Sequence, residues 1–314
     1  MLDFVSILNV VLPVYLTMLL GGVLRWKKVL PEEADQGMMR LVVAVLTPCL
    51  ILDRVTGNEA VMALGPVLVA AALGFGLVVL GIAVAYLAAP LIGLHVGEGR
   101  RTFAVSNGLQ NYGFVAIPIV VALCPDGRTL GVMFTFTLGV ELACWVAGVG
   151  LLTGVASAPW RLALNPPVIA IVTACLLNFT GTHVWVPEVA RTTFHFIGAC
   201  AVPLALMIIG ASIAQIWGQE RIRWGVAALS PLLRLGLIPL AFLAVAKWMP
   251  VSEELRNILV IQASMPSAVF NIMIARHYGG HGATAVQVVL STTLVSLLTT
   301  PLVIAWGMEW VRAG

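Results

Sequence analysis

The chain is dominated by long apolar stretches, and short loops between them hold nearly all of the Lys, Arg, Asp and Glu residues. A helix needs roughly 20 mostly apolar residues to cross a membrane. The stretches are continuously apolar rather than alternating, so they predict helices and not the strands of a membrane barrel. Ten spans are predicted, at 4–24, 39–55, 62–94, 103–124, 129–155, 166–181, 192–216, 224–248, 257–276 and 283–311.

The composition supports a membrane protein and excludes several other classes. Of 314 residues, 60% are hydrophobic and 10% are charged, whereas soluble domains have about a quarter of their residues charged. The 31 charged side chains are too few to cover a soluble globule of this size. A soluble enzyme, a disordered chain and a nucleic-acid-binding protein are therefore excluded. The first apolar stretch has no basic segment before it and is too long for a signal peptide, so we expect it to be a retained span.

The sequence contains none of the short motifs that carry enzyme chemistry. There is no HExxH, no phosphate-binding loop, no GxSxG and no cluster of Cys and His residues. The five cysteines form no CxxC pair, and they are expected to be small apolar core residues. We therefore expect no enzymatic activity, no cofactor and no metal site.

The distribution of Lys and Arg predicts the orientation in the membrane, because these residues concentrate in cytoplasmic loops. Nine of them follow odd-numbered spans, six lie on the opposite side, and Arg40 and Arg234 fall inside spans. This bias predicts that the loops after the odd-numbered spans, including the connection at 157–166, face the cytoplasm. Both termini are then periplasmic, and the host membrane is expected to be the inner (plasma) membrane.

The two halves of the chain, residues 1–155 and 156–314, resemble each other. Pro48 and Pro203 occupy matching places in spans two and seven, and spans four and nine both carry polar, proline-containing interruptions, NGLQNYGFVAIP and QASMPSAVFN. Five spans is an odd number, so the second half must be inverted relative to the first. Inverted repeats with interrupted helices are typical of secondary transporters, whose binding sites lie at the interruptions. The alternative is a pair of proline kinks that serve packing.

The interruptions favour binding of an anion. Pro118 breaks the helical hydrogen bonding, and a helix that restarts in mid-membrane presents a partly positive N-terminus. Asn107 and Asn111 lie one turn apart on one face, and their amides can donate hydrogen bonds to a carboxylate. Asn271 is the counterpart in span nine. No Lys or Arg lies within either interruption, which favours a single carboxylate; the alternative role for the Asn residues is to join helices.

Two ionisable residues lie deep in the predicted spans, where such residues are usually functional. Glu141 is the one acid well inside a span, and Arg234 is the comparably deep base. Glu141 is therefore a candidate proton carrier or coupling group, with Arg234 as a second coupling candidate. The alternative is a buried ion pair between Glu141 and Arg234 or Arg40 that fixes packing.

Several segments, in order, resemble the auxin efflux carrier family, which includes bacterial organic-anion permeases and the plant PIN-FORMED exporters. The similarity covers nearly the whole chain and includes QNYGFVAIP, with Asn111 seven residues before Pro118, and then LNPPVIA, AVPLALMIIGAS and SMPSAVFNIMIARHYGG. It implies ten spans, a scaffold at 4–55 and 166–216, and a moving transport domain at 62–155 and 224–311. It also implies elevator-like transport and a homodimer formed through the scaffold.

The resemblance implies as well that Asn111 holds a substrate carboxylate beside the prolines of the two interruptions, Pro118 and Pro266. Ser267, which lies near Asn271 in span nine, is a further candidate for substrate binding. The chain departs from the plant proteins at Asn271, where they carry proline, and at Met39, where they usually carry Asn. Their long cytoplasmic loop is also reduced here to SAPWRLALNP. These differences indicate a bacterial member and make auxin a doubtful substrate.

The expected function is a carrier for small organic anions such as mono- or dicarboxylates, working as a uniporter or coupled to protons. Its expected partners are that anion, membrane lipid and a second copy of the chain, and not nucleic acid. One alternative is a sodium-coupled symporter of the bile-acid type, although span nine lacks the acid that such proteins use. The other is a membrane sensor with the same fold, although ten spans leave no room for a signalling domain.

Overall fold

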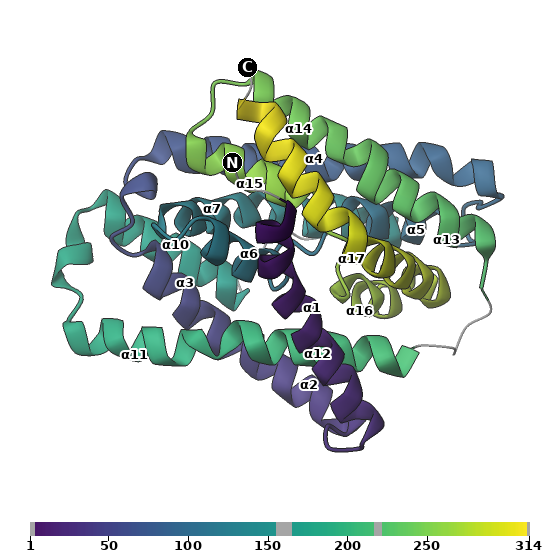
Figure 1. Ribbon diagram of the computed structural model, residues 1–314, viewed down its shortest axis with the longest axis horizontal. Helices are drawn as coiled ribbons and strands as arrows, with labels where there is room; N and C mark the ends of the chain where they lie inside the picture. Colours follow the sequence, from purple (N-terminus) through teal and green to yellow (C-terminus); the bar gives the residue numbers. More distant parts are fainter. Residues whose placement is uncertain (1–3, 155–164, 217–221, 313–314) are drawn as a thin grey trace.

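The computed structural model describes residues 4–154, 165–216 and 222–312, and all of their regular secondary structure is helical (Figure 1). Within these ranges no β-strand forms, and the one strand-like feature is an isolated antiparallel bridge between Gln110 and Ser267. The predicted all-helical class is thus confirmed.

The first half of the chain contains two continuous helices and several interrupted ones. A π-helical segment, Val42–Leu46, joins α2 to α3, and a second, Cys144–Val149, joins α7 to α8. Short 3-10 turns lie at Glu59–Val61 and Ala89–Ile92. The α-helices are α1 (Phe4–Trp26), α2 (Glu32–Leu41), α3 (Thr47–Val55), α4 (Leu64–Ala88), α5 (Arg100–Gly108), α6 (Ala116–Leu123), α7 (Arg128–Ala143) and α8 (Gly150–Thr153).

The second half has a comparable set of long and interrupted helices. A π-helical segment, Leu232–Leu237, joins α13 to α14, and a 3-10 turn lies at Thr182–Trp185. The α-helices are α10 (Pro166–Phe179), α11 (Glu188–Ala199), α12 (Ala201–Ile216), α13 (Trp224–Pro231), α14 (Ile238–Trp248), α15 (Glu253–Ala263), α16 (Phe270–His277) and α17 (Gly282–Arg312).

Six helical runs among the described residues are long and apolar enough to cross a membrane. They are Phe4–Trp26, Leu64–Ile92, Arg128–Thr153, Glu188–Ile216, Trp224–Trp248 and Gly282–Arg312. Predicted spans four and nine do not qualify because each is split into two short helices, and α10 in span six has only 14 residues. The arrangement of ten spans as inverted repeats therefore stays a prediction. The predicted cytoplasmic connection at 157–166 lies outside the described residues except for its last two.

Glycines allow two pairs of long helices to approach very closely. Where α1 packs against α12, a Cβ added at Gly210 would lie 1.7 Å from the carbonyl oxygen of Met18. Where α4 packs against α7, a Cβ at Gly139 would lie 1.8 Å from the carbonyl oxygen of Ala71. Small residues at these contacts let the two backbones touch, as is usual for helices packed in membranes.

The helices form two packed groups around the interrupted segments. In one group α1 lies against α12, and α3 contacts both α10 and α11. Helix α11 continues into α12, and the two form one long run across the molecule (Figure 1). In the other group α4 packs against α5 and α7, α13 against α17, and α14 against α15. The groups meet where α1 contacts α17, and there the hydroxyl groups of Tyr15 and Ser296 lie 2.8 Å apart.

Candidate functional site: the crossing of two broken helices

The two predicted interruptions are real breaks in helical structure. The first lies between α5 and α6, where helix ends at Gly108 and resumes at Ala116, and Pro118 occupies the first turn of the new helix. The second lies between α15 and α16, from Ser264 to Val269, and contains Pro266. Proline is tolerated in a first helical turn but not in a helix interior, so both prolines favour a break near where it occurs.

The breaks cross each other and satisfy part of each other's backbone. The backbone N–H of Asn111 donates to the carbonyl oxygen of Pro266 at 2.7 Å, and the backbone N–H of Ala268 donates to the carbonyl oxygen of Leu109 at 3.1 Å. Exposed backbone is tolerated at membrane depth only where protein or a water-filled cavity receives it, and here each break receives the other.

Asn271 and Ser267 fasten one break to the other. The Nδ2 of Asn271 donates to the carbonyl oxygens of Leu109 at 2.9 Å and Ser106 at 3.3 Å, and it lies 3.0 Å from Ser267 Oγ. Ser267 Oγ in turn donates to the Ser106 carbonyl at 2.6 Å. Both side chains are buried. They supply hydrogen-bond donors to carbonyl oxygens at the C-terminal end of α5, where a helix has no further N–H groups of its own to offer.

The side chain of Asn111 makes no hydrogen bond within the described part of the chain, although it is only 7% exposed. Asn107 is fully buried, and its Nδ2 donates to the carbonyl oxygen of Phe103 at 2.8 Å. The Oδ1 of Asn107 has no partner. Of the predicted amides, Asn111 is therefore the one whose hydrogen-bonding capacity is not used inside the described structure.

Gln262 joins both breaks to a third helix. Its Nε2 donates to the carbonyl oxygen of Tyr112 at 2.9 Å, and its Oε1 accepts from Gln110 Nε2 at 3.4 Å. Its own carbonyl oxygen accepts from Nη2 of Arg234 at 3.2 Å. Gln110 was not among the residues that the sequence singled out, although it lies between Asn107 and Asn111 in the same polar segment.

Arg234 brings a positive charge to the crossing from the π-helical segment Leu232–Leu237. The side chain is completely buried, its Nε donates to the carbonyl oxygen of Met265 at 3.0 Å, and its guanidinium lies 5.6 Å from the centre of the Phe242 ring. Its Nη1 has no partner. The interruptions contain no Lys or Arg of their own, but the fold supplies one from a neighbouring helix.

Glu141, on α7, contacts the crossing through Tyr112. Its carboxylate accepts from the Tyr112 hydroxyl, from Trp145 Nε1 at 3.2 Å and from Asn165 Nδ2 at 3.2 Å. The alternative of a buried ion pair with Arg234 or Arg40 is not found: among the described residues neither base pairs with Glu141, and Arg40 is exposed. Three neutral donors surround the carboxylate instead.

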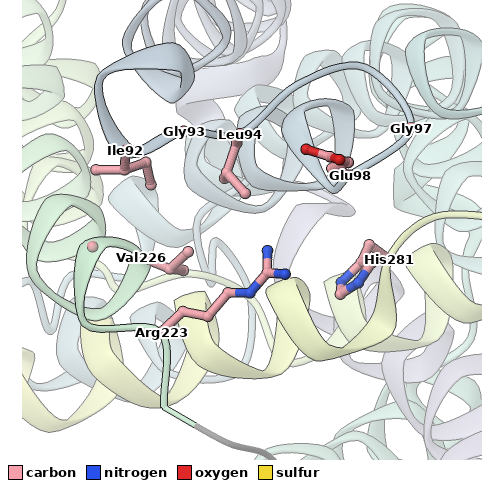
Figure 2. A pocket seen from close by; sticks show the side chains of 9 residues that line it. Ile92, Gly93, Leu94, Gly97, Glu98, Arg223, Val226 and His281 are labelled. Atoms are coloured by element: carbon pink, nitrogen blue, oxygen red, sulfur yellow. The ribbon is translucent and has the colours of Figure 1, made fainter.

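Two pockets lie away from the crossing. One, of about 450 Å³, is formed by the residues before α5, the start of α13 and the loop before α17, and the Arg223 guanidinium projects into it, with Glu98 and His281 both on one side of it (Figure 2). The other, of about 510 Å³, is lined mainly by apolar residues of α3, α10 and α11. Within the described ranges no three His, Cys, Asp or Glu residues are placed to hold a metal ion.

The apolar helices and the paired breaks define a helical membrane protein of the transporter class. The model of the membrane transport protein family matches residues 6–158 and 151–304. The chain therefore belongs to this family, the auxin efflux carrier family that the sequence resembles.

Two archaeal proteins, each named as an uncharacterized transporter, are similar over nearly their whole length. The one from Methanocaldococcus jannaschii is 22% identical over 320 residues, which cover 97% of this chain and 98% of its own. The one from Methanothermobacter thermautotrophicus is 24% identical over 310 residues, which cover 95% and 98%.

Proposed function

We propose that the protein is a secondary transporter that carries small organic anions and binds them where the two broken helices cross. The observation that carries this proposal is the crossing itself, where two breaks pair through their backbones while the side chain of Asn111 keeps its hydrogen-bonding groups free within the described structure. Broken helices at matching places in two halves are typical of transporter binding sites.

The chemistry of the crossing suits a carboxylate. The N-terminal ends of α6 and α16 each carry a partial positive charge. The Asn111 amide adds donors that carry no charge, and Arg234 adds a full positive charge close by. In this proposal Asn107, Pro118, Pro266, Ser267 and Asn271 shape and support the site.

The two packed groups of helices support an elevator-like movement. The group around α1, α3, α10, α11 and α12 corresponds to the proposed scaffold, which also forms the homodimer, and the group that carries the crossing is the proposed moving domain. We further propose that the chain crosses the inner membrane ten times, as two inverted repeats, and that both termini are periplasmic. Transport is either uniport or coupled to protons through Glu141.

Sodium coupling is the weaker alternative. A sodium ion at the crossing would need free carbonyl oxygens, yet those of Ser106 and Leu109 already accept hydrogen bonds from Ser267, Ala268 and Asn271. The second break also has no carboxylate to offer. A sensor without transport remains the other alternative, and measured flux distinguishes it from a carrier.

Purified protein screened against mono- and dicarboxylates by thermal shift, followed by counterflow in proteoliposomes with every hit, tests the proposal. We expect a stabilising carboxylate that also exchanges across the membrane. Stabilisation without exchange would indicate a sensor, and a response to no carboxylate would contradict the proposal.

A further inference from the structure

We infer that the crossing selects a monocarboxylate that also carries a hydroxyl group, with Arg234 as the counter-charge and Gln110 as the acceptor for the hydroxyl. This inference rests on the proposed function, because it assumes that a carboxylate binds at the crossing. It goes further by defining the charge of the substrate and its second functional group.

Three polar atoms buried around the crossing have no hydrogen-bond partner: Asn107 Oδ1, Gln110 Oε1 and Arg234 Nη1. All three residues are 0% exposed. Leaving a buried polar atom unsatisfied is costly, so such a cluster calls for a ligand or water that completes it. One of the three atoms is a cationic donor and two are amide acceptors.

The orientations of these amides follow from their neighbours. Gln262 must direct its nitrogen to the carbonyl oxygen of Tyr112, so its oxygen faces Gln110 and requires the nitrogen of Gln110 there. The Oε1 of Gln110 is thereby left as a free acceptor. In the same way, the Phe103 carbonyl takes the nitrogen of Asn107 and leaves its oxygen free. A free acceptor requires a ligand that donates, and a carboxylate has no hydrogen to donate.

Gln262 holds the acceptor and the cation together. Its side-chain oxygen contacts Gln110, and its backbone oxygen contacts Arg234. The Arg234 guanidinium also bonds the Met265 carbonyl, and the next residue, Pro266, binds the backbone of Asn111. A short chain of contacts therefore joins the cation, the free acceptor and the free amide of Asn111.

The charges favour one carboxylate rather than two. Arg234 is the one Lys or Arg side chain that is fully buried within the described ranges, and no acid pairs with it. A monocarboxylate neutralises it. A second carboxylate would find no further buried cation, and Glu141 on the other side of Tyr112 would repel it. Dianions should therefore bind more weakly than monoanions of similar size.

The test compares propanoate, 2-hydroxypropanoate, 3-hydroxypropanoate and malonate as ligands of the purified wild-type protein by calorimetry. One added neutral hydrogen bond corresponds to about 3- to 10-fold in affinity. We expect the better hydroxypropanoate to bind tighter than propanoate by that factor, and malonate to bind at least about tenfold more weakly than the same hydroxypropanoate.

Four substitutions at two positions assign the preference to named side chains. Gln110→Met should reduce the ratio between hydroxypropanoate and propanoate affinity to about one, and Gln110→Asn should keep part of the ratio. Arg234→Lys should keep the preference for monoanions, whereas Arg234→Met should weaken all carboxylates and abolish the preference. A purely structural role for Arg234 would leave the ratio between monoanion and dianion unchanged.

The outcomes separate this inference from the proposed function. Equal binding of propanoate and both hydroxypropanoates, or tighter binding of malonate, would overturn the inference and leave a carboxylate carrier in place. Failure of all four acids and of the wider carboxylate screen would overturn the proposed function itself. The wild-type series decides the inference even where a variant does not fold.

Discussion

Asn111 and Asn271 are chemically identical side chains at one crossing, yet their surroundings give them different tasks. The nitrogen of Asn271 contacts three oxygen atoms that belong to the protein: the carbonyl of Leu109 in the other break, the carbonyl of Ser106 in the last turn of α5, and the hydroxyl of Ser267. The side chain of Asn111 makes no hydrogen bond among the described residues. Asn271 therefore contributes to the stability of the crossing, and Asn111 is available for a ligand.

This difference predicts opposite effects of the same substitution. Asn111→Ala should weaken carboxylate binding by at least about tenfold, because a hydrogen bond to a charged group is lost, while the melting temperature stays unchanged. Asn271→Ala should cost about 1–3 kcal/mol of stability, because buried carbonyls lose their donor. Calorimetric binding and thermal unfolding of both variants decide the matter. A folded Asn111→Ala protein with wild-type affinity would remove Asn111 from the site.

Glu141 is predicted to set the pH dependence of transport if the carrier is coupled to protons. Glu141→Gln imitates the protonated side chain, so the variant should still bind and exchange substrate but should lose net transport driven by a pH gradient. Proteoliposome flux with and without a gradient measures this, and Glu188→Gln on the exposed start of α11 is the matched control. A stable variant with full pH dependence would show that Glu141 is not the coupling group.

At the residue scale, the sequence identifies candidate site residues by their type and position in a span, but it does not show which residues of different helices contact each other. Pro118, Pro266 and the Asn residues were identified because proline and polar groups are conspicuous in an apolar span. The position of Arg234 at the crossing could not be predicted, because it depends on how one helix packs against the end of another. The alternative of an ion pair at Glu141 could not be decided from the sequence for the same reason, since sequence shows which charges are deep but not which are neighbours.

At the scale of helices, close contact between backbones is the main structural constraint. Gly210→Ala should push α1 away from α12, because the new Cβ would meet the carbonyl oxygen of Met18 at 1.7 Å, and overpacking of this kind costs about 1–3 kcal/mol. Gly76→Ala in α4 is the matched control, since its Cβ would meet nothing within 4 Å. Thermal unfolding in detergent compares the two. Equal melting temperatures would mean that α1 and α12 have room to separate.

The positions of the helices can be predicted from the apolar stretches, but the interruptions inside the helices can be predicted only in part. The continuous runs at α1, α4 and α17 match predicted spans. The π-helical segments at Val42–Leu46, Cys144–Val149 and Leu232–Leu237 have no comparable signal, because a wider helical turn is set by packing around it. Counting spans from hydropathy therefore gives ten, whereas six helical runs among the described residues are by themselves both long and apolar enough to cross a membrane.

At the scale of the whole molecule, the predicted orientation can be tested with single cysteines. Lys28 follows α1 and Glu59 follows α3, and both side chains are exposed. In a variant without the five native cysteines, a membrane-impermeant maleimide applied to intact cells should label Glu59→Cys and not Lys28→Cys. The reverse pattern would place both termini in the cytoplasm. Labelling of both sites after the cells are permeabilised is the control for reactivity.

The elevator proposal requires α1 and α17 to slide past each other, so the contact between Tyr15 and Ser296 must break in every transport cycle. In the cysteine-free background, Tyr15→Cys together with Ser296→Cys should be joined by a short bifunctional thiol reagent, and transport should then stop while substrate binding continues.

The matched control for this cross-link lies within the proposed scaffold. Gly22→Cys with Ala214→Cys joins α1 to α12, where the two Cβ atoms would be 3.4 Å apart, close to the spacing of a disulfide. Two helices that move as one body can be linked without loss of flux, so this pair should transport when oxidised. Full transport by the protein linked between α1 and α17 would contradict relative movement of the two groups. Inhibition by both links would show that α1 and α12 also have to move apart.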